Sequence, residues 1–515
     1  MGSRVQALGL LLKKAALPLL VTIAVIVLVV ILLCSRGGAG YFPVKGEMRA
    51  NIDTHLEITF REVPEVGESG FIRIFDASTG ECVDSLDLSL PAGHTEPRTY
   101  APDIDYPKVP YDYARDIVPT NRNTVPGTPS GTAEPTPRDM QLTIIGGFTD
   151  GFHFHPVLVR GKTAVIYPHN NVLEYGHRYC VTIDEGVLLC GKYKGEKHWR
   201  FSTKASGPAD PRRLSVNADG SADFNTLQGA LDAVPDFCPD TTWIRVAAGD
   251  YEEIVYTRNK TNLVIQGSGK EKTLVHYANN EVFNPHPLTL KNNEKKGTFP
   301  YRRAAVSFDN CTGVVLKDIS FATDLKGQAE GLLLNGDRIE LYRVGITGSG
   351  DALQANGTIY LEDVEITGDG DTILGRGSIY AYHSTIRNHG GPLSWVRNFK
   401  PAHGNVFVEC LLESVNPDKP ADYGRTGNNH GATYPDAETV LLNCTTRNFL
   451  PAGWSIIGMP SATMLELQTR DADSGDLVDV SQRHPYSRQL DPVKDAALIA
   501  KYRDPAFVLA GWQPR

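Results

Sequence analysis

The stretch LYRVGITGSGDALQANGTIY (341–360) runs directly into LEDVEITGDGDTILGRGSIY (361–380), and the two align as consecutive units of 20 residues. Isoleucine recurs at the same step, at Ile346, Ile366 and Ile386. A period near 20 with several short strands in each unit is typical of a stacked solenoid. Because the strands are rich in β-branched and aromatic residues, the repeat predicts an all-β fold, a right-handed parallel β-helix.

Short strands separated by Gly and Asn turns continue on both sides of the repeat. Upstream, VNADGSADFNTLQGALDAVP (216–235) predicts a strand, a polar turn and a short helix, and WIRVAAGDY (243–251) predicts the next strand. Downstream, NVFVECLLES (405–414) and TVLLNCTTRN (439–448) extend the series. We therefore assign residues 207–515 to one β-helical domain.

Residues 41–206 carry a different pattern. Segments such as LEITF (56–60) and FIRIF (71–75) alternate apolar and polar residues, as half-buried antiparallel strands do. Nine prolines lie within residues 97–137, so this stretch is expected to be an extended insertion in a single β-sandwich. The layout resembles the bacterial Ig-like modules of surface proteins, and we expect residues 41–206 to form a small Ig-like domain.

An uncharged run of 20 residues, Ala15 to Cys34, follows the basic residues Arg4, Lys13 and Lys14. A helix of this length spans about 30 Å, the thickness of the hydrocarbon core of a bilayer. Residues 1–40 are therefore expected to form a signal anchor with one membrane-spanning helix, and a cleaved signal peptide is the alternative. Either reading places the rest of the chain outside the cytoplasm, anchored by residues 15–34 or secreted.

The composition of the 515 residues, 41% hydrophobic and 22% charged, is that of a globular protein. A formal net charge of −9 without a long Lys/Arg run argues against nucleic-acid binding. The eight cysteines include no CxxC pair, which excludes a zinc ribbon and a thioredoxin-like redox site. Cys410 and Cys444 end two similar strands and are expected to be buried free thiols. We expect a monomer.

The repeat places two carboxylates at equivalent positions, because Asp351 in GSGDAL aligns with Asp371 in GDGDTI. Neighbouring parallel strands lie about 4.8 Å apart, so equivalent side chains stack at roughly that distance. Two carboxylates this close cannot both ionise readily, so one pKa is expected to rise while the other stays low. The pair predicts a nucleophile beside a general acid; two unrelated turn aspartates are the alternative reading.

The surrounding sequence resembles the pectin methylesterase (pectinesterase) family from Arg213 to Arg515. Three segments carry the resemblance: VNADGSADFNTLQGALDAVP, IRVAAGDYEEIV (244–255) and PAGW (451–454). The family is expected to bring a carboxylic ester hydrolase activity that removes methyl esters from pectin (homogalacturonan). The resemblance implies methyl-esterified polygalacturonate, or a related uronate polymer, as the partner, and neither a cofactor nor a metal.

Four family motifs recur in the same order along the chain. A motif like QAVALR is matched by QAEGLLL, which starts at Gln328, and one like QDTLY by GDALQ, which contains Asp351. DFIFG is matched by DTILG, which starts at Asp371, and LGRPW by YGR, which ends at Arg425. The resemblance implies that Asp371 is the nucleophile and Asp351 the acid and base. It also implies that Gln328 donates to the oxyanion and that Arg425 orients the nucleophile.

Two positions depart from the family pattern. Gly350 stands where the family has a second Gln, and no Trp follows Arg425. Loss of one oxyanion donor commonly lowers kcat by about 10²–10³, so we expect a substitute donor, either a backbone N–H of the GSGD turn or the side chain of Gln354. The departures leave two alternatives open: a β-helical pectate lyase or polygalacturonase, and a non-catalytic surface protein that binds polysaccharide.

Overall fold

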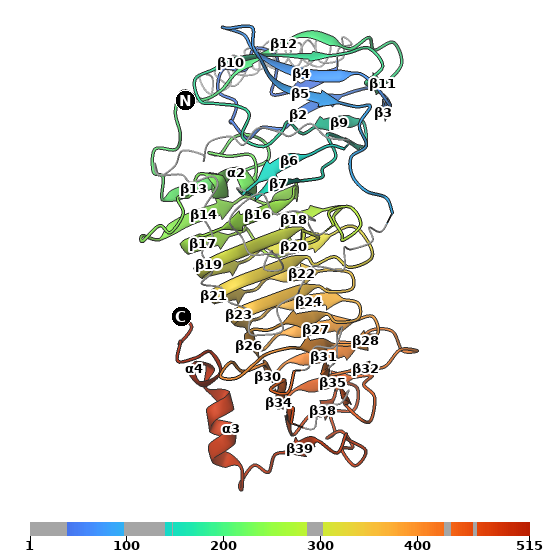
Figure 1. Ribbon diagram of the computed structural model, residues 1–515, viewed down its shortest axis with the longest axis vertical. Coiled ribbons are helices and arrows are strands. Elements are labelled where there is room, and N and C mark those ends of the chain that lie inside the picture. The colour runs from blue at the N-terminus through green and yellow to red at the C-terminus, as the bar shows by residue number, and fades with distance from the viewer. Residues whose placement is uncertain (1–38, 97–139, 147, 286–301, 427–433, 457–460) are drawn as a thin grey trace, which may run out of the picture.

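The computed structural model describes residues 39–96, 140–146, 148–285, 302–426, 434–456 and 461–515. The chain forms an elongated stack, with an antiparallel β-structure at one end and the coils of a solenoid below it (Figure 1). The predicted membrane segment 15–34 and the proline-rich stretch 97–137 lie outside the described residues. Within those ranges, no helix is both long enough and apolar enough to cross a membrane.

Two antiparallel sheets of four strands form the N-terminal end and share one core. Trp199 lies in this core, and its Nε1 donates a hydrogen bond to the Pro43 carbonyl oxygen at 2.9 Å. The first sheet contains, in order, β1 (Gly40–Phe42), β2 (Leu56–Thr59), β9 (Thr163–Ile166) and β8 (Val157–Arg160). The second contains β12 (Glu196–Ser202), β10 (Arg178–Ile183), β4 (Phe71–Asp76) and β5 (Cys82–Asp87). Two short pairs join β3 (Glu65–Val66) to β11 (Leu188–Leu189) and β6 (Thr143–Ile145) to β7 (Phe148–Phe152).

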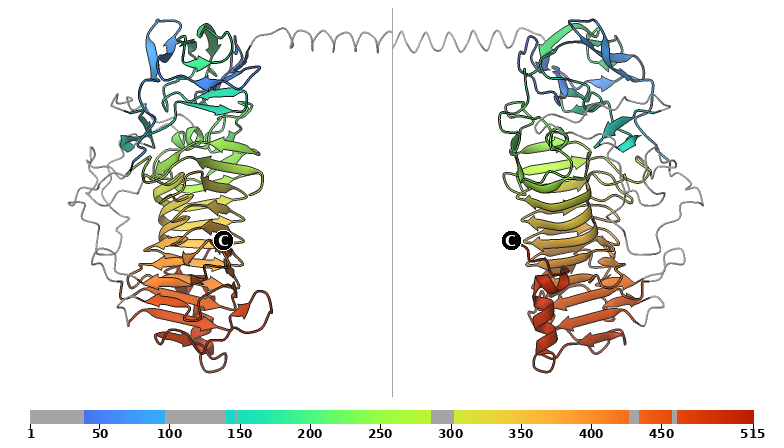
Figure 2. Two further views of the ribbon diagram at one scale, coloured as in Figure 1. Left: turned by 90° about the vertical axis from the view of Figure 1, so that its right-hand side faces the viewer. Right: turned by 60° about the vertical axis from the view of Figure 1, so that its left-hand side comes forward.

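Parallel strands from successive coils form two long sheets along the stack, so the chain is the predicted parallel β-helix (Figure 2). The main path of the larger sheet contains β13 (Arg213–Val216), β14 (Thr242–Val246), β17 (Thr261–Gln266), β19 (Val306–Lys317), β21 (Leu332–Tyr342), β23 (Leu353–Glu362), β26 (Ser378–Tyr382), β30 (Asn405–Val408), β34 (Glu438–Leu442), β37 (Thr463–Leu467) and β39 (Ser487–Gln489). Beside this path lie β16 (Val255–Arg258), β25 (Ile373–Gly375), β29 (Ser394–Val396), β33 (Gly424–Thr426) and β36 (Trp454–Ile456).

The smaller sheet contains β15 (Gly249–Glu252), β18 (Thr273–Tyr277), β20 (Ser320–Thr323), β22 (Gly345–Thr347), β24 (Glu365–Gly368), β27 (Thr385–Asn388), β31 (Leu411–Ser414), β35 (Thr445–Arg447) and β38 (Arg470–Asp471). A further short pair joins β28 (Gly391–Pro392) to β32 (Ala421–Asp422). All pairings in these sheets connect one coil to the next, so side chains at equivalent positions stack along the axis.

The predicted step of 20 residues is the length of one coil in the middle of the stack. Ile346 pairs with Ile366, and Ile366 pairs with Ile386. The turn that leads from the larger to the smaller sheet contains one left-handed residue in each coil, with φ 52° at Arg343 and φ 55° at Asp363. The sequence repeat therefore follows a repeated backbone conformation.

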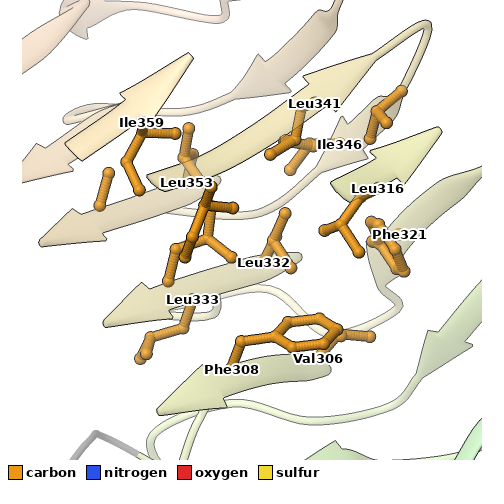
Figure 3. Close-up of a cluster of buried hydrophobic side chains, with 14 of the residues drawn as sticks. Val306, Phe308, Leu316, Phe321, Leu332, Leu333, Leu341, Ile346, Leu353 and Ile359 are labelled. Atoms are coloured by element: carbon orange, nitrogen blue, oxygen red, sulfur yellow. The ribbon is translucent and has the colours of Figure 1, made fainter. Parts of the chain in front are cut away.

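Apolar side chains fill the space between the two sheets. Val306, Leu332 and Leu353 follow one another in register, and all three are completely buried (Figure 3). Such stacking gives the dense interior on which most of the stability depends. Cys410 and Cys444 belong to the same core as free thiols, as the sequence analysis predicts.

The C-terminal helices α3 (Ala496–Arg503) and α4 (Pro505–Val508) pack on the outer face of the larger sheet. The rings of Tyr360 and Tyr380 on this face stack at a centroid distance of 5.9 Å. The Tyr380 hydroxyl donates to the Arg503 carbonyl oxygen at 2.9 Å. This face is thereby closed to a long ligand and differs from the face that holds the predicted carboxylates.

The short helix α2 (Leu227–Asp232), which the sequence predicts, joins the two parts of the molecule. The Asp53 carboxylate of the sandwich accepts hydrogen bonds from the Thr226 N–H and hydroxyl, both at 2.8 Å. The side chains of Asn170 and Asn171 donate to the helix residue Asp232, each at 2.9 Å. The sandwich therefore docks through buried polar contacts on the first coil.

We expect Ile366→Ala to lower the free energy of unfolding by about 2–4 kcal/mol, because the change leaves a cavity between Ile346 and Ile386. The control is Thr367→Ala on the same strand, where the side chain is only half-buried and a change within about 0.5 kcal/mol is expected. Urea unfolding followed by circular dichroism measures both. Equal losses would contradict the stacked-core account.

Candidate active site

The structure brings the four predicted site residues to one face of the β-helix. Asp351 and Asp371 each lie two residues before a strand, and these strands, β23 and β25, pair directly, so the two carboxylates occupy adjacent coils as predicted. Gln328 lies just before β21, one coil earlier. Arg425 lies in β33, which β29 separates from β25. The period of the repeat thus places the pair, and longer coils supply Arg425.

Arg425 holds Asp371 by a two-point contact. Its Nε donates to Oδ1 at 2.7 Å and its Nη2 to Oδ2 at 2.5 Å. A fork-to-fork pair of this kind fixes the plane of the carboxylate and favours its ionised form. Asp371 remains partly exposed, so an oxygen of a fixed, ionised carboxylate is accessible to a ligand.

An aromatic ring supports Arg425 from the preceding coil. The Arg425 guanidinium lies 3.9 Å from the ring centroid of Trp395, and that of Arg397 lies 4.4 Å from it. Cations over an indole face are attracted by its quadrupole, so Trp395 helps to hold the group that orients Asp371. The sequence analysis finds no Trp after Arg425 and misses Trp395, which lies in another coil outside the 20-residue repeat.

Asp351 has a different environment from Asp371. It is 8% exposed, and burial raises the pKa of its carboxyl to about 7, with Arg303 opposing the rise and Glu330 and Asp371 adding to it. A carboxyl group with this pKa keeps its proton in part of the molecules at neutral pH and can serve as a general acid. The predicted rise of one pKa in the pair falls on Asp351.

Two charged residues beside Asp351 were not among the predicted site residues. Arg303 Nη2 donates to Asp351 Oδ2 at 2.7 Å, and the same nitrogen lies 2.7 Å from Glu330 Oε1. Glu330 lies 21 residues before Asp351, close to the repeat length, so the period could have identified it. Arg303 lies 27 residues before Glu330, and no regular step points to it.

Gln328 is exposed, and its side-chain oxygen accepts a hydrogen bond from Arg303 Nη1 at 2.5 Å. Its Nε2 therefore remains to donate to a ligand, in agreement with the expected role at an oxyanion. The alternative donor Gln354 is only 4% exposed, and its Oε1 has no hydrogen-bond partner among the described residues.

Gly350 cannot be replaced by the family's Gln without a backbone movement. Its φ is +78°, a left-handed value, and a Cβ built there would lie 2.7 Å from the Gly327 carbonyl oxygen and 3.3 Å from Gln328 Cα. Because contacts below 3.0 Å with backbone are repulsive, this turn is specific for glycine. The departure from the family pattern is therefore coupled to a different backbone beside Gln328.

The described residues were also searched for clusters able to hold a metal ion. They contain no group of three or more His, Cys, Asp or Glu side chains suitably placed. The candidate site within these ranges consists of carboxylates, arginines and one exposed amide.

Comparison with known proteins places this arrangement in a family. The family model described as Pectinesterase matches residues 213–404, which contain Gln328, Asp351 and Asp371. Probable pectinesterase 55 from Arabidopsis thaliana is 30% identical over 273 residues, which make up 48% of this chain and 74% of that protein. The chain belongs to the pectinesterase family.

Other members of the pectinesterase family match over different lengths. Probable pectinesterase 8 from Arabidopsis thaliana is 26% identical over 312 residues, 56% of this chain and 73% of that protein. Pectinesterase 5 from the same plant is 27% identical over 143 residues, and the match spans only 22% of its length. The chain thus spans less than a quarter of some curated relatives.

Solved structures of pectin methylesterases also resemble the chain. The enzyme from carrot aligns with a TM-score of 0.48 and 21% identity, over 59% of this chain and 95% of that one. The enzyme from Aspergillus niger aligns with a TM-score of 0.45 and 21% identity, over 58% of this chain and 97% of that one.

For this member of the pectinesterase family, we expect Gly350→Gln to lower kcat at least tenfold, because the new side chain clashes with Gly327 and displaces Gln328. Gly350→Ala is the graded comparison and should lower kcat less, since it adds only the Cβ. Methanol release from methylated polygalacturonate measures both. A hundredfold rise in kcat for the Gln variant would show that the natural site lacks an oxyanion donor.

Proposed function

We propose that this chain is a carboxylic ester hydrolase that removes methyl esters from pectin. One observation carries the proposal: adjacent coils hold two carboxylates in opposite states. The Arg425 fork keeps Asp371 ionised and oriented, whereas Asp351 lies in a buried site where its pKa is raised to about 7. Nucleophilic attack on an ester followed by proton transfer to the leaving alcohol requires such a pair.

In the first step, an Asp371 oxygen attacks the ester carbonyl carbon and forms a tetrahedral oxyanion. The Gln328 Nε2 donates a hydrogen bond to that oxyanion. As the C–O bond to the methoxy group breaks, Asp351 gives its proton to the leaving oxygen and methanol departs. The enzyme then carries the uronyl group as a mixed anhydride on Asp371.

In the second step, Asp351 is a carboxylate and acts as the base. It takes a proton from water, whose oxygen attacks the anhydride carbonyl. Collapse of this intermediate releases the uronate and restores Asp371 as a carboxylate, with Asp351 protonated again. No cofactor and no metal takes part in either step, and a backbone N–H of the turn at Gly350 is the proposed second donor to the oxyanion.

The substrate follows from the chemistry of the cleaved bond and from the family. We infer a methyl-esterified polygalacturonate or a related uronate polymer, bound on the face that holds Asp351 and Asp371. We further infer that the sandwich is an Ig-like module, because it consists of two four-stranded antiparallel sheets over one core. The uncharged run 15–34 supports a monomer that works outside the cytoplasm, anchored by this segment or secreted after its cleavage.

Asp371→Asn is expected to abolish methanol release from methylated polygalacturonate, because the amide keeps the shape of the nucleophile but not its charge. The matched control is Asp363→Asn in the same coil, where the side chain is exposed and φ is 55°, a value that Asn tolerates. The control should retain activity. More than a tenth of wild-type turnover in the Asp371 variant would refute the assignment.

Chelation separates this proposal from a β-helical pectate lyase. We expect EDTA to leave methanol release unchanged, because the proposed acid, nucleophile and orienting cation are Asp351, Asp371 and Arg425. The same samples should show no absorbance of an unsaturated uronate product. Loss of activity in EDTA that calcium restores would favour the lyase, and binding of the polymer without any turnover would favour a polysaccharide-binding protein.

A further inference from the structure

Arg303 lies beneath the proposed active site with its guanidinium fully engaged. Its Nε donates to both oxygens of Glu330, at 2.8 and 2.9 Å. Its Nη1 donates to Glu281 Oε2 at 2.8 Å and to Gln328 Oε1 at 2.5 Å, and its Nη2 donates to Asp351 Oδ2 at 2.7 Å. The Arg303 side chain is only 6% exposed, so these contacts are made away from solvent. One cation therefore joins the proposed oxyanion donor to the proposed acid.

The contact with Gln328 decides which end of its amide meets a substrate. A guanidinium carries hydrogen-bond donors and no acceptor. Only the amide oxygen of Gln328 can therefore face Arg303, and the amide nitrogen is turned away as a donor. A glutamine without such a partner could present either end, and its oxygen would repel a developing oxyanion.

The contact with Asp351 leaves one carboxyl oxygen for the transferable proton. Arg303 occupies Oδ2, so Oδ1 remains to carry the proton toward the leaving group. An unbalanced cation at this distance would strip that proton. Glu330 prevents this, because its Oε1 also lies 2.7 Å from Arg303 Nη2 and its side chain is completely buried. The two carboxylate oxygens are thus separated by no more than twice that distance.

Charged groups from several elements face Asp351. Glu330 and Arg303 approach from the preceding coils, and Asp371 from the following one. Arg397 acts from the coil of β29, and Arg425 from that of β33. Glu281 reaches the group only through Arg303. The cations Arg303, Arg397 and Arg425 are balanced by Glu281, Glu330 and Asp371 when Asp351 is neutral.

We propose that Arg303, counterbalanced by Glu330 and Glu281, is a positioning residue that sets both the orientation of the Gln328 amide and the protonation of Asp351. This inference rests on the proposed ester hydrolysis. It assigns a role to three residues that do not touch the reacting atoms. It also explains why a completely buried glutamate is placed at the same step of the coil as the two aspartates.

The first test is the pH dependence of kcat/KM for methanol release by Glu330→Gln. Wild-type activity should fall as the pH rises through about 7, where Asp351 loses its proton. Glu330 raises the pKa of Asp351, so its neutralisation lowers that pKa, and the alkaline limb should move to lower pH by about one unit. A purely structural role would lower the activity at all pH values without moving the limb.

Two further variants separate charge from geometry. Glu281→Gln, at a partly exposed position, removes a second counter-charge of Arg303 and should move the limb in the same direction by less. Arg303→Lys keeps the charge but loses the fork that orients Gln328, so kcat should fall by about 10²–10³ while KM and the limb change little. Because Glu281 is partly exposed, its variant tests the idea even if Glu330→Gln fails to fold.

The matched control is a second buried clamp remote from Asp351. Arg483 donates to both oxygens of Glu466, at 2.9 and 3.0 Å, and the side-chain exposures are 6% and 0%, equal to those of Arg303 and Glu330. Glu466→Gln should lower the melting temperature without moving the limb.

An unmoved limb in both glutamate variants, or an equal shift in the control, would overturn the inference. Absence of methanol release by the wild-type chain would instead overturn the proposed function itself. In the free protein, the pKa of Asp351 read from the 13C shift of labelled aspartate distinguishes these cases without turnover. A lowered value in Glu330→Gln is the expected result.

Discussion

The register of parallel strand pairing is the constraint on which the structure depends. Each coil is hydrogen-bonded to the next, so a residue at one position of the repeat has a defined neighbour along the axis. Register turns a sequence period into columns of side chains: isoleucines inside and carboxylates on one outer face. A slip by one residue would exchange the two sets, so packing of the core and placement of Asp351 and Asp371 are the same event.

Two arginine clamps then make equivalent carboxylates unequal. Asp371 is paired with Arg425 at the partly exposed edge of the site, whereas Asp351 shares Arg303 with a buried glutamate. The backbone supplies symmetry between adjacent coils, and the arginines remove it. Buried ion pairs of this kind add little net stability. Their value here lies in the orientation and protonation that they impose on neighbouring groups.

The ends of the solenoid are closed by different means. Stacked coils expose strand edges at both ends, and such edges invite aggregation unless they are covered. At the first end, helix α2 enters the core and the sandwich docks over it through Asp53, Asn170 and Asn171. The C-terminal helices instead cover the outer face of the larger sheet. The open face that remains is the one that carries the candidate site.

The sequence by itself determined the β-helix and the adjacent Asp351 and Asp371, because both follow from a period that equals one coil. The same period reaches Glu330, 21 residues before Asp351. Only the tertiary structure decided the places of Arg303 and Trp395, which lie in coils of other lengths. Their distance from the site in the chain carries no information about their distance in space, since loops of irregular length set it.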